Sequence, residues 1–319
     1  MSQEEPTVEN IEVLNRELLD SIRKAPDGNL TKQASAATNM IRRKIRENGF
    51  SRVILPHKTV SDDDLSYLPN TELPVVVEEM EPESTGAKSI SFNDSADTRL
   101  FRGDKFVVIF NKITTDEYTK NVDELRTYKG DLRGVVTDNA LKEIQTEEDF
   151  AFISTIDRLV GTIETGDGAT GGVQHNGISG GIDRSNYVDS LSYLEDRDLN
   201  NGIFLMNRKT AKAFLKFKRD ELGGDLAQTL FTDGLSSLSK GQVMGVRHIF
   251  TIKGDIVGND HVYQFAEPNY LGRAYVLQNV TMYVEKKKDI LRFSAMEKLG
   301  VTIANVAAVN KVDFGYVAP

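Results

Sequence analysis

The sequence has no cysteine and only four histidines among its 319 residues. Without cysteine there is no disulfide, thiolate zinc site, iron–sulfur cluster or cysteine nucleophile. The histidines are widely spaced, and none belongs to an H-E-x-x-H pair, so we interpret each as a surface residue or a hydrogen-bonded structural residue: His57, His175, His248 and His261. We therefore expect neither a metal site nor a bound cofactor.

The sequence also lacks any long apolar run. No stretch approaches the roughly 20 apolar residues that a membrane span requires. The first residues, MSQEEPTVEN, lack the basic and apolar segments of a signal peptide. A hydrophobic content of 39% is enough for a packed core. The composition therefore predicts a globular protein with no membrane among its partners.

The chain has no excess of positive charge, because its 48 acidic residues outnumber its 39 lysines and arginines and give a net charge of −9. This argues against a dedicated nucleic-acid reader, which normally carries a basic face. One segment between Thr31 and Lys58 is nevertheless basic, with Glu47 as its single acid. Its densest part is a possible DNA-facing or neighbour-docking arm: Arg42, Arg43, Lys44 and Arg46. The alternative is a solvated helix face.

Glycine is concentrated in TGDGATGGVQHNGISGG, from Thr165 to Gly181. The string matches G-x-G-x-x-G over Gly166–Gly171 and G-x-S-x-G around Ser179. A dinucleotide site needs a strand before the glycines and a helix after them. Here a helical pattern precedes the loop, and the following GVQHNGISGGIDRSN has too much glycine to begin a helix. We therefore expect a flexible surface loop, with a nucleotide-binding enzyme as a remote alternative.

Acidic pairs offer no better catalytic centre. Glu147 and Glu148, and Asp62 to Asp64, are interpreted as helix-start and surface charges. No base, nucleophile or metal constellation accompanies them, so we predict that the protein is not an enzyme.

The order of predicted elements starts with two amphipathic helices, one beginning at Thr7 and one following Asn29 and ending at Gly49. Two β-rich runs, LPVVVEEMEPES and DKFVVIFNKI, then predict a long hairpin. Its polar tip residues suit an intersubunit contact: Lys88, Asp94, Asp97, Arg99 and Arg102. A lone hairpin is marginally stable in water, so we expect it to lie on another surface.

Helical periodicity then runs from about Thr119 to Val160, with a bend expected at Gly130 and Gly134. After the glycine loop, NGIFLMN predicts a buried strand, and Asn207 can cap a helix that runs through RKTAKAFLKFKRDELGG. The remaining pattern predicts strands in VMGVRHIFTI, HVYQF, RAYVLQNVTMYVE, ILRFSAMEKL and VTIANVAAV, with a turn at Lys288 to Asp289. The fold class is therefore α+β.

This order of elements resembles the tailed-bacteriophage major capsid proteins of the Hong Kong 97 type. The resemblance rests on the long helix DLRGVVTDNALKEIQTEEDFAFISTID, the TGDGATGG loop, GIFLMNRKTAKAFLKF and the late MEKLGVTIANVAAVNKVDF, and it covers nearly the whole chain. It implies the Hong Kong 97-like capsid fold: an N-terminal helical arm, an extended β-hairpin loop, a long spine helix, and peripheral and axial domains.

The resemblance also implies boundaries and partners. The ranges would be an arm at 1–73, the extended loop at 74–113, the spine helix and glycine-rich connector of the peripheral domain at 114–185, a mainly axial domain at 186–255, and a return to the peripheral domain at 256–319. The chain would partner itself as hexamers and pentamers of an icosahedral shell around double-stranded DNA. Portal, scaffold or decoration proteins would be further partners. The shell would be assembled in the host cytoplasm and located in the virion.

Two further points follow from the resemblance. Some members of the family join subunits by a lysine–asparagine isopeptide bond, but no local motif assigns that role to Lys88, Asn305 or Asn310, so we predict no cross-link. An encapsulin-like nanocompartment shell has the same fold and is the alternative within structural proteins. The long N-terminal arm favours the viral shell.

Overall fold

The computed structural model describes residues 28–29, 49–68, 71–79, 87, 89–92, 94–95, 98, 103, 105–121, 123, 132–161, 174–217, 242–243 and 245–315. The two helices predicted before residue 50 and the segment 162–173 lie outside these ranges. Within the described part of the chain, no helix has the length and apolar character needed to cross a membrane.

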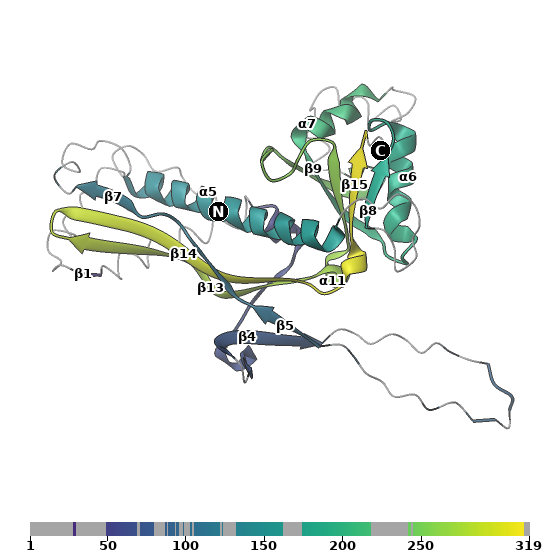
Figure 1. The fold of residues 1–319 in the computed structure, drawn as a ribbon, viewed down its shortest axis with the longest axis horizontal. Coiled ribbons are helices and arrows are strands. Elements are labelled where there is room, and N and C mark those ends of the chain that lie inside the picture. The colour runs from purple at the N-terminus through teal and green to yellow at the C-terminus, as the bar shows by residue number, and fades with distance from the viewer. Residues whose placement is uncertain are drawn as a thin grey trace, which may run out of the picture.

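Helix α5 (Leu132–Val160) is the longest helix of the described chain, and it lies along the first sheet (Figure 1). The predicted apolar stripe is buried at Phe152, Ile153 and Ile156, whereas Leu159 is partly exposed and Val160 takes its place in the core. This core also includes residues of both large sheets, such as Leu205 and Leu299. Helix α5 therefore packs against two sheets at once.

The first sheet is built on a long antiparallel hairpin, β13 (Gly272–Lys287) and β14 (Ile290–Ile303). Buried positions alternate along most of β14 and in the second part of β13, whereas Ala274 to Val276 of β13 are buried in succession. The hairpin turns at Lys288, which has a positive φ of 54°. Short strands complete the sheet: β1 (Gly28–Asn29), β2 (His57–Thr59), β6 (Asn111–Thr114) and β7 (Tyr118–Asn121).

The second sheet has the strand order β10-β11-β9-β12-β15-β8. Its strands are β8 (His175–Ile178), β9 (Asn201–Asn207), β10 (Gln242–Val243), β11 (Val246–Thr251), β12 (His261–Ala266) and β15 (Val309–Phe314). The associated helices are α6 (Arg184–Glu195), α7 (Arg208–Ala211), η2 (Lys212–Lys216), α11 (Pro268–Leu271) and η3 (Val306–Ala308). A second core between α6, η2 and this sheet includes Tyr187, Phe204 and Phe214.

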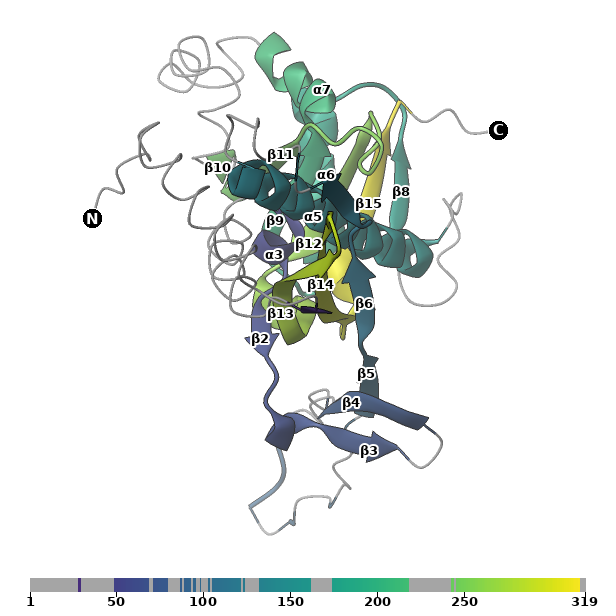
Figure 2. The same cartoon turned by 90° about the vertical axis from the view of Figure 1, so that its left-hand side faces the viewer.

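A third sheet extends away from the body (Figures 1 and 2). Its strands are β3 (Ser66–Leu68), β4 (Thr71–Glu79) and β5 (Lys105–Ile109), preceded by α3 (Ser51–Ile54) and η1 (Asp62–Asp64). Strands β4 and β5 pair antiparallel from Val75 with Ile109 to Glu79 with Lys105. The two runs predicted to form a hairpin are therefore paired, although DKFVVIFNKI divides into β5 and β6.

Several predicted boundaries were wrong. The long helix does not begin at Thr119, because residues 118–121 pair with β14 as strand β7. Gly134 lies inside α5, and Gly130 lies outside the described residues. The helix capped by Asn207 is only a four-residue α-helix that continues as the short 3₁₀ helix η2.

The C-terminal half contained one more error. VTIANVAAV is not one strand, because it contains the end of β14 and the 3₁₀ helix η3. Strands on both sides of residue 256 belong to the second sheet, since β12 pairs with β9 and β15 pairs with β12. The predicted domain ranges stay predictions. A strand pattern alone cannot say which sheet a strand joins, because pairing across a long sequence separation is set by tertiary packing.

Candidate functional site

The sheet that extends from the body has one face packed and one face largely open. The packed face carries Val76 and Val108, which contact Val60 and Tyr275 of the body. Directly paired residues of an antiparallel sheet share a face, and the face alternates along each strand. The pair Val77 and Val107, together with Ile109, therefore belongs to the opposite face.

This outer face is apolar. Ile109 is 58% exposed and Val107 is 41% exposed, and Val77 is also exposed. A monomeric protein rarely groups large apolar side chains on an exposed sheet, because each exposed side chain forfeits about 1.5–3 kcal/mol of burial free energy. The exposed part of the outer face of β4 and β5, beside the buried Val75, is therefore a candidate surface for binding another protein.

The base of this sheet is fixed tightly to the body through Gly300 of β14. A Cβ atom at Gly300 would lie 2.8 Å from Cγ1 of Val108 and 3.1 Å from the carbonyl oxygen of Ile109. Val108 is fully buried and β-branched, so it has little freedom to move aside. The absence of a side chain at position 300 thus permits close approach of β5 to β14.

A buried ionic junction joins α3, α5 and β14. Arg52 donates to Glu148 through both Nε (3.0 Å) and Nη2 (2.7 Å), and Nη2 also donates to Glu297. The Glu148 side chain is 1% exposed and that of Glu297 is fully buried. Two buried carboxyl groups therefore share one guanidinium, whose side chain is 13% exposed.

The charges at this junction are not equivalent. Burial, together with the neighbouring Glu148 carboxylate, raises the pKa of Glu297 to about 9. Burial also disfavours ionisation of Glu148, but hydrogen bonds from Glu297 and Arg52 outweigh it and lower the pKa of Glu148. At neutral pH, Glu148 is thus the carboxylate and Glu297 holds a proton.

Asp149 extends the junction to the second sheet. Its Oδ1 accepts from the backbone N–H of Ser51 (3.0 Å), and its Oδ2 accepts from Lys253 Nζ (2.6 Å), just beyond β11. Burial is the main cause of the raised pKa of Asp149. Glu148 and Asp149, which are adjacent on α5, therefore hold α3 and the residue Lys253 that follows β11.

The sequence interpretation missed this junction. Glu148 was predicted to be a surface charge, but it is buried, and Arg52 belongs to an internal ion pair instead of a surface basic segment. The interpretation was correct for Asp62 to Asp64, which are exposed in η1. The sequence did contain a sign that Glu148 is buried. Glu148 lies four residues before the buried Phe152, and residues four apart lie on the same face of a helix.

Of the residues predicted to form contacts, Asp94 belongs to the part of the chain that the structure describes. Asp94 is exposed, and its Oδ1 accepts a hydrogen bond from the backbone N–H of Ser95 (3.0 Å). The other predicted contact residues lie outside the described residues: Lys88, Asp97, Arg99, Arg102, Arg42, Arg43, Lys44 and Arg46. The predictions for these positions stay predictions.

The two asparagines considered for cross-linking have structural roles in the chain. Asn305 Oδ1 accepts from the backbone N–H of Ala307 at the start of η3 (3.0 Å). Asn310 is fully buried and donates to Gln264 Oε1 (2.8 Å). Lys88 lies outside the described residues.

The flanks of the glycine-rich string differ from the prediction. Residues 175–178 form strand β8, and helix α6 begins at Arg184 with Asp183 as its N-cap, accepting from the Asn186 N–H at 2.8 Å. A strong N-cap here outweighs the unfavourable glycines before it. Ser179 lies five positions before this helix, so it is not at the sharp strand-to-helix turn of a nucleophile elbow. Gly166–Gly171 lie outside the described residues.

The described residues contain no group of three histidine, aspartate or glutamate side chains that could hold a metal ion. Hydrogen bonds involve all four histidines: His57 with the Leu55 carbonyl, His248 with Tyr187, and His175 and His261 with Asp313. The expectation that they are surface or hydrogen-bonded residues is therefore confirmed.

Comparison of structures defines the class of fold. The chain matches the capsid of the native GTA particle with a TM-score of 0.58 at 16% identity, over 83% of this chain and 89% of that chain. It matches the mature capsid of bacteriophage PhiM1 with a TM-score of 0.56 at 11% identity, over 85% and 88%. The predicted capsid fold of the Hong Kong 97 type is thus confirmed.

A third match is a virus-like particle from Pyrococcus furiosus, with a TM-score of 0.52 at 13% identity, over 89% of this chain and 99% of that chain. No family model and no curated protein matches the sequence. The chain therefore has the fold of known capsid structures, although its sequence is only 11–16% identical to theirs.

Proposed function

We propose that this chain is the major capsid protein of a tailed phage, assembling as hexamers and pentamers into an icosahedral head around double-stranded DNA. The observation that carries the proposal is the capsid fold, matched over more than four-fifths of the chain. Capsid proteins are structural, and we expect no enzymatic activity.

The exposed sheet supports this proposal physically. A closed shell of identical chains needs surfaces that are complementary between copies. The outer face of β4 and β5 has exposed apolar residues that a neighbouring subunit would cover. We assign residues 74–113 to an extended loop that reaches over the adjacent subunit, with 114–185 and 256–319 mainly peripheral and 186–255 mainly axial. The second sheet unites strands from both ranges, so the chain crosses between these domains more than once.

The remaining partners follow from the role of a shell. The arm with Arg42, Arg43, Lys44 and Arg46 would face packaged DNA by weak, non-specific contact or would dock on an acidic neighbour. Salt-dependent affinity for duplex DNA separates these two roles. Portal, scaffold and decoration proteins would bind the assembled shell. We place the protein in the virion after assembly in the host cytoplasm.

The second candidate is the shell of an encapsulin-like compartment that encloses protein cargo. The match to the Pyrococcus furiosus virus-like particle favours it, because that match covers nearly the whole of the other chain. The two candidates share a fold and differ in what the shell contains.

The test is negative-stain electron microscopy with light scattering, on the protein expressed alone and with its genomic neighbours. Closed particles or rings of five and six subunits are expected. Nucleic acid inside them supports the viral head, and protein cargo supports the compartment. A monodisperse monomer or dimer under both conditions overturns both candidates, and nucleotide titration then tests the Gly166–Gly171 loop.

A variant of the exposed sheet tests its role in assembly. Ile109→Asp places a charge in the proposed contact, and burying an unpaired charge costs several kcal/mol. We expect this variant to fold but to form rings or shells poorly. Ile109→Val, the matched control, keeps an apolar side chain and should assemble as the wild type does. Equal assembly of both variants contradicts a contact at this face.

A further inference from the structure

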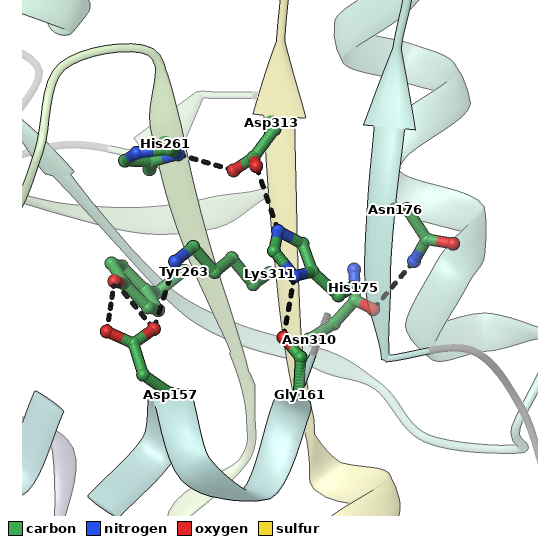
Figure 3. Close-up of polar contacts among 9 residues, drawn as sticks. All are labelled: Asp157, Gly161, His175, Asn176, His261, Tyr263, Asn310, Lys311 and Asp313. Atoms are coloured by element: carbon green, nitrogen blue, oxygen red, sulfur yellow. Dashed lines mark hydrogen bonds and ion pairs between the residues drawn. The ribbon is translucent and has the colours of Figure 1, made fainter. Parts of the chain in front are cut away.

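A polar cluster joins the end of α5 to three strands of the second sheet (Figure 3). Asp313 of β15 lies between two histidines: its Oδ2 is 2.9 Å from His175 Nε2, and its Oδ1 is bonded to His261 Nδ1. The other ring nitrogen of His175, Nδ1, is 2.9 Å from the carbonyl oxygen of Gly161. His175 therefore connects β8, β15 and the C-terminus of α5.

The geometry determines the protonation state that His175 needs. A backbone carbonyl and an ionised carboxylate are acceptors only, so the ring must donate from both nitrogens to make both hydrogen bonds. Only the imidazolium does so. A neutral ring has one N–H and one lone pair, and that lone pair would face an oxygen. Losing one proton from His175 thus removes one of the two links.

Gly161 gives the link a defined position. It ends α5 with a φ of 72°, and its N–H donates to the Asp157 carbonyl at 3.1 Å. This left-handed conformation directs the chain out of the helix, as at many glycine-terminated helices. The hydrogen bond from His175 to Gly161 joins residues 14 apart in the sequence, so it connects the end of α5 to the start of β8.

Other charged and polar groups lie next to the cluster. From α5, Asp157 accepts from Lys311 Nζ and from the Tyr263 hydroxyl, each at 3.0 Å. Burial is the main cause of the raised pKa of Tyr263, which is therefore neutral. Asp157 and Lys311 thus form an ion pair of their own, and Asp313 is the carboxylate that both histidines contact.

Asp313 keeps its charge under the same conditions. Burial alone would disfavour the carboxylate, but the hydrogen bonds from His261 and His175 outweigh it and lower the pKa of Asp313. Asp313 therefore stays a carboxylate at mildly acidic pH, where it can accept hydrogen bonds from both histidines.

We propose that His175, Asp313 and His261 form a proton-controlled latch between the end of helix α5 and the second sheet. The latch is closed at mildly acidic pH, when His175 donates to both Gly161 and Asp313. It loosens as the pH rises and His175 loses its second ring proton. The latch lies within one chain, so it does not depend on the proposed shell function.

Hydrogen–deuterium exchange by mass spectrometry tests the latch in the full-length protein, whether free or assembled. Protection of peptides covering 157–161 and 309–314 is compared at pH 6.0 and pH 8.5, after correction for intrinsic exchange. In the wild type we expect protection to fall about tenfold at the higher pH, the effect of losing one charge-assisted hydrogen bond. Peptides of the central strand β9 report the change in global stability between the two pH values and serve as the internal reference.

Variants identify the responsible residue. His175→Gln should abolish the pH dependence in excess of that of the β9 peptides. Asp313→Asn should show at pH 6.0 the weak protection, relative to β9, that the wild type shows at pH 8.5. His57→Gln is the matched control. It should keep the wild-type response, because His57 lies beside Arg52 and makes no contact with the histidine–aspartate cluster. Wild-type protection that is equal at both pH values, or a His175→Gln variant that responds as the wild type does, overturns the latch.

A second measurement needs no folded variant of the cluster. In ¹⁵N spectra of the histidine rings at pH 6.0, His175 should show two protonated nitrogens. A bare nitrogen on His175 at that pH overturns the proposal. Electron microscopy of the same samples reports shell formation separately, so failure of the latch and failure of the capsid assignment are distinguishable.

Discussion

The junction of Arg52, Glu148 and Glu297 makes a quantitative prediction about a buried proton. If Glu297 is a neutral acid in the folded protein, then Glu297→Gln replaces it with a neutral group of similar shape. The amide oxygen can accept from Arg52, and the amide N–H can donate to Glu148 in place of the acid proton. At pH 7 we expect the variant to be more stable than the wild type, because the wild type must take up a proton on Glu297 when it folds and the glutamine variant does not.

The double variant Glu148→Gln/Glu297→Gln should behave differently. It leaves Arg52 buried without a carboxylate, and removing the partner of a buried charge costs ~3–5 kcal/mol. Single Glu148→Gln should be milder than the double variant, because Glu297 can then ionise and pair with Arg52. The two substitutions should therefore be strongly non-additive.

The pH dependence gives the sharper test. The pKa of Glu297 is raised in the folded state, to about 9, above its usual 4.5. Between these values the folded protein holds a proton that the unfolded chain releases, so this group makes stability fall as pH rises. The wild type should lose roughly 1 kcal/mol per pH unit relative to Glu297→Gln, or on the order of 3 kcal/mol between pH 6 and pH 8.

The assay is guanidinium unfolding followed by far-ultraviolet circular dichroism, because the sequence has no tryptophan to serve as a fluorescent probe. Light scattering confirms that wild type and variants are compared in the same assembly state. Parallel stability curves for wild type and Glu297→Gln from pH 6 to pH 8 refute the shared-proton description. So does a Glu297→Gln variant as unstable at pH 7 as the double variant.

Two further predictions concern packing. Gly300→Ala should lower stability by ~1–3 kcal/mol, because its Cβ would lie 2.8 Å from Val108 Cγ1, and a melting temperature equal to that of the wild type contradicts the tight contact. Tyr187→Phe should cost ~1–3 kcal/mol, since the Tyr187 hydroxyl is 2.8 Å from Nε2 of the buried His248 and its removal leaves that nitrogen without a donor. Chemical unfolding at pH 7 measures this loss, and a change below about 0.5 kcal/mol would show that the hydrogen bond contributes little.

The strands were the part of the fold best predicted from the sequence. NGIFLMN is a continuous apolar run because β9 is central in its sheet and buried at most positions. The alternation in β13 and β14 was recognisable because one face of each strand is covered. Asn207 caps α7 as predicted, with its Oδ1 accepting from the Lys209 N–H at 2.9 Å. These features depend on local pattern and local hydrogen bonding.

The misread features depend on distant partners. Residues 118–121 form a strand because β14, about 170 positions away, offers them an edge. Glu148 is buried because Arg52 and Glu297 come to it across separations that no local pattern reveals. The latch is another such case, since His175 and Asp313 are 138 positions apart. The role of these polar residues depends on partners that are distant in the sequence, so it could be recognised only from the folded structure.

The most direct test of the central claim is an icosahedral cryo-electron microscopy reconstruction of particles assembled from this chain. We predict a closed shell with fivefold and sixfold clusters, in which a neighbouring subunit covers Val107 and Ile109 on the exposed sheet. A chain that stays monomeric or dimeric when expressed with its genomic neighbours would contradict the capsid assignment. A shell that leaves these two side chains in solvent would contradict the proposed contact.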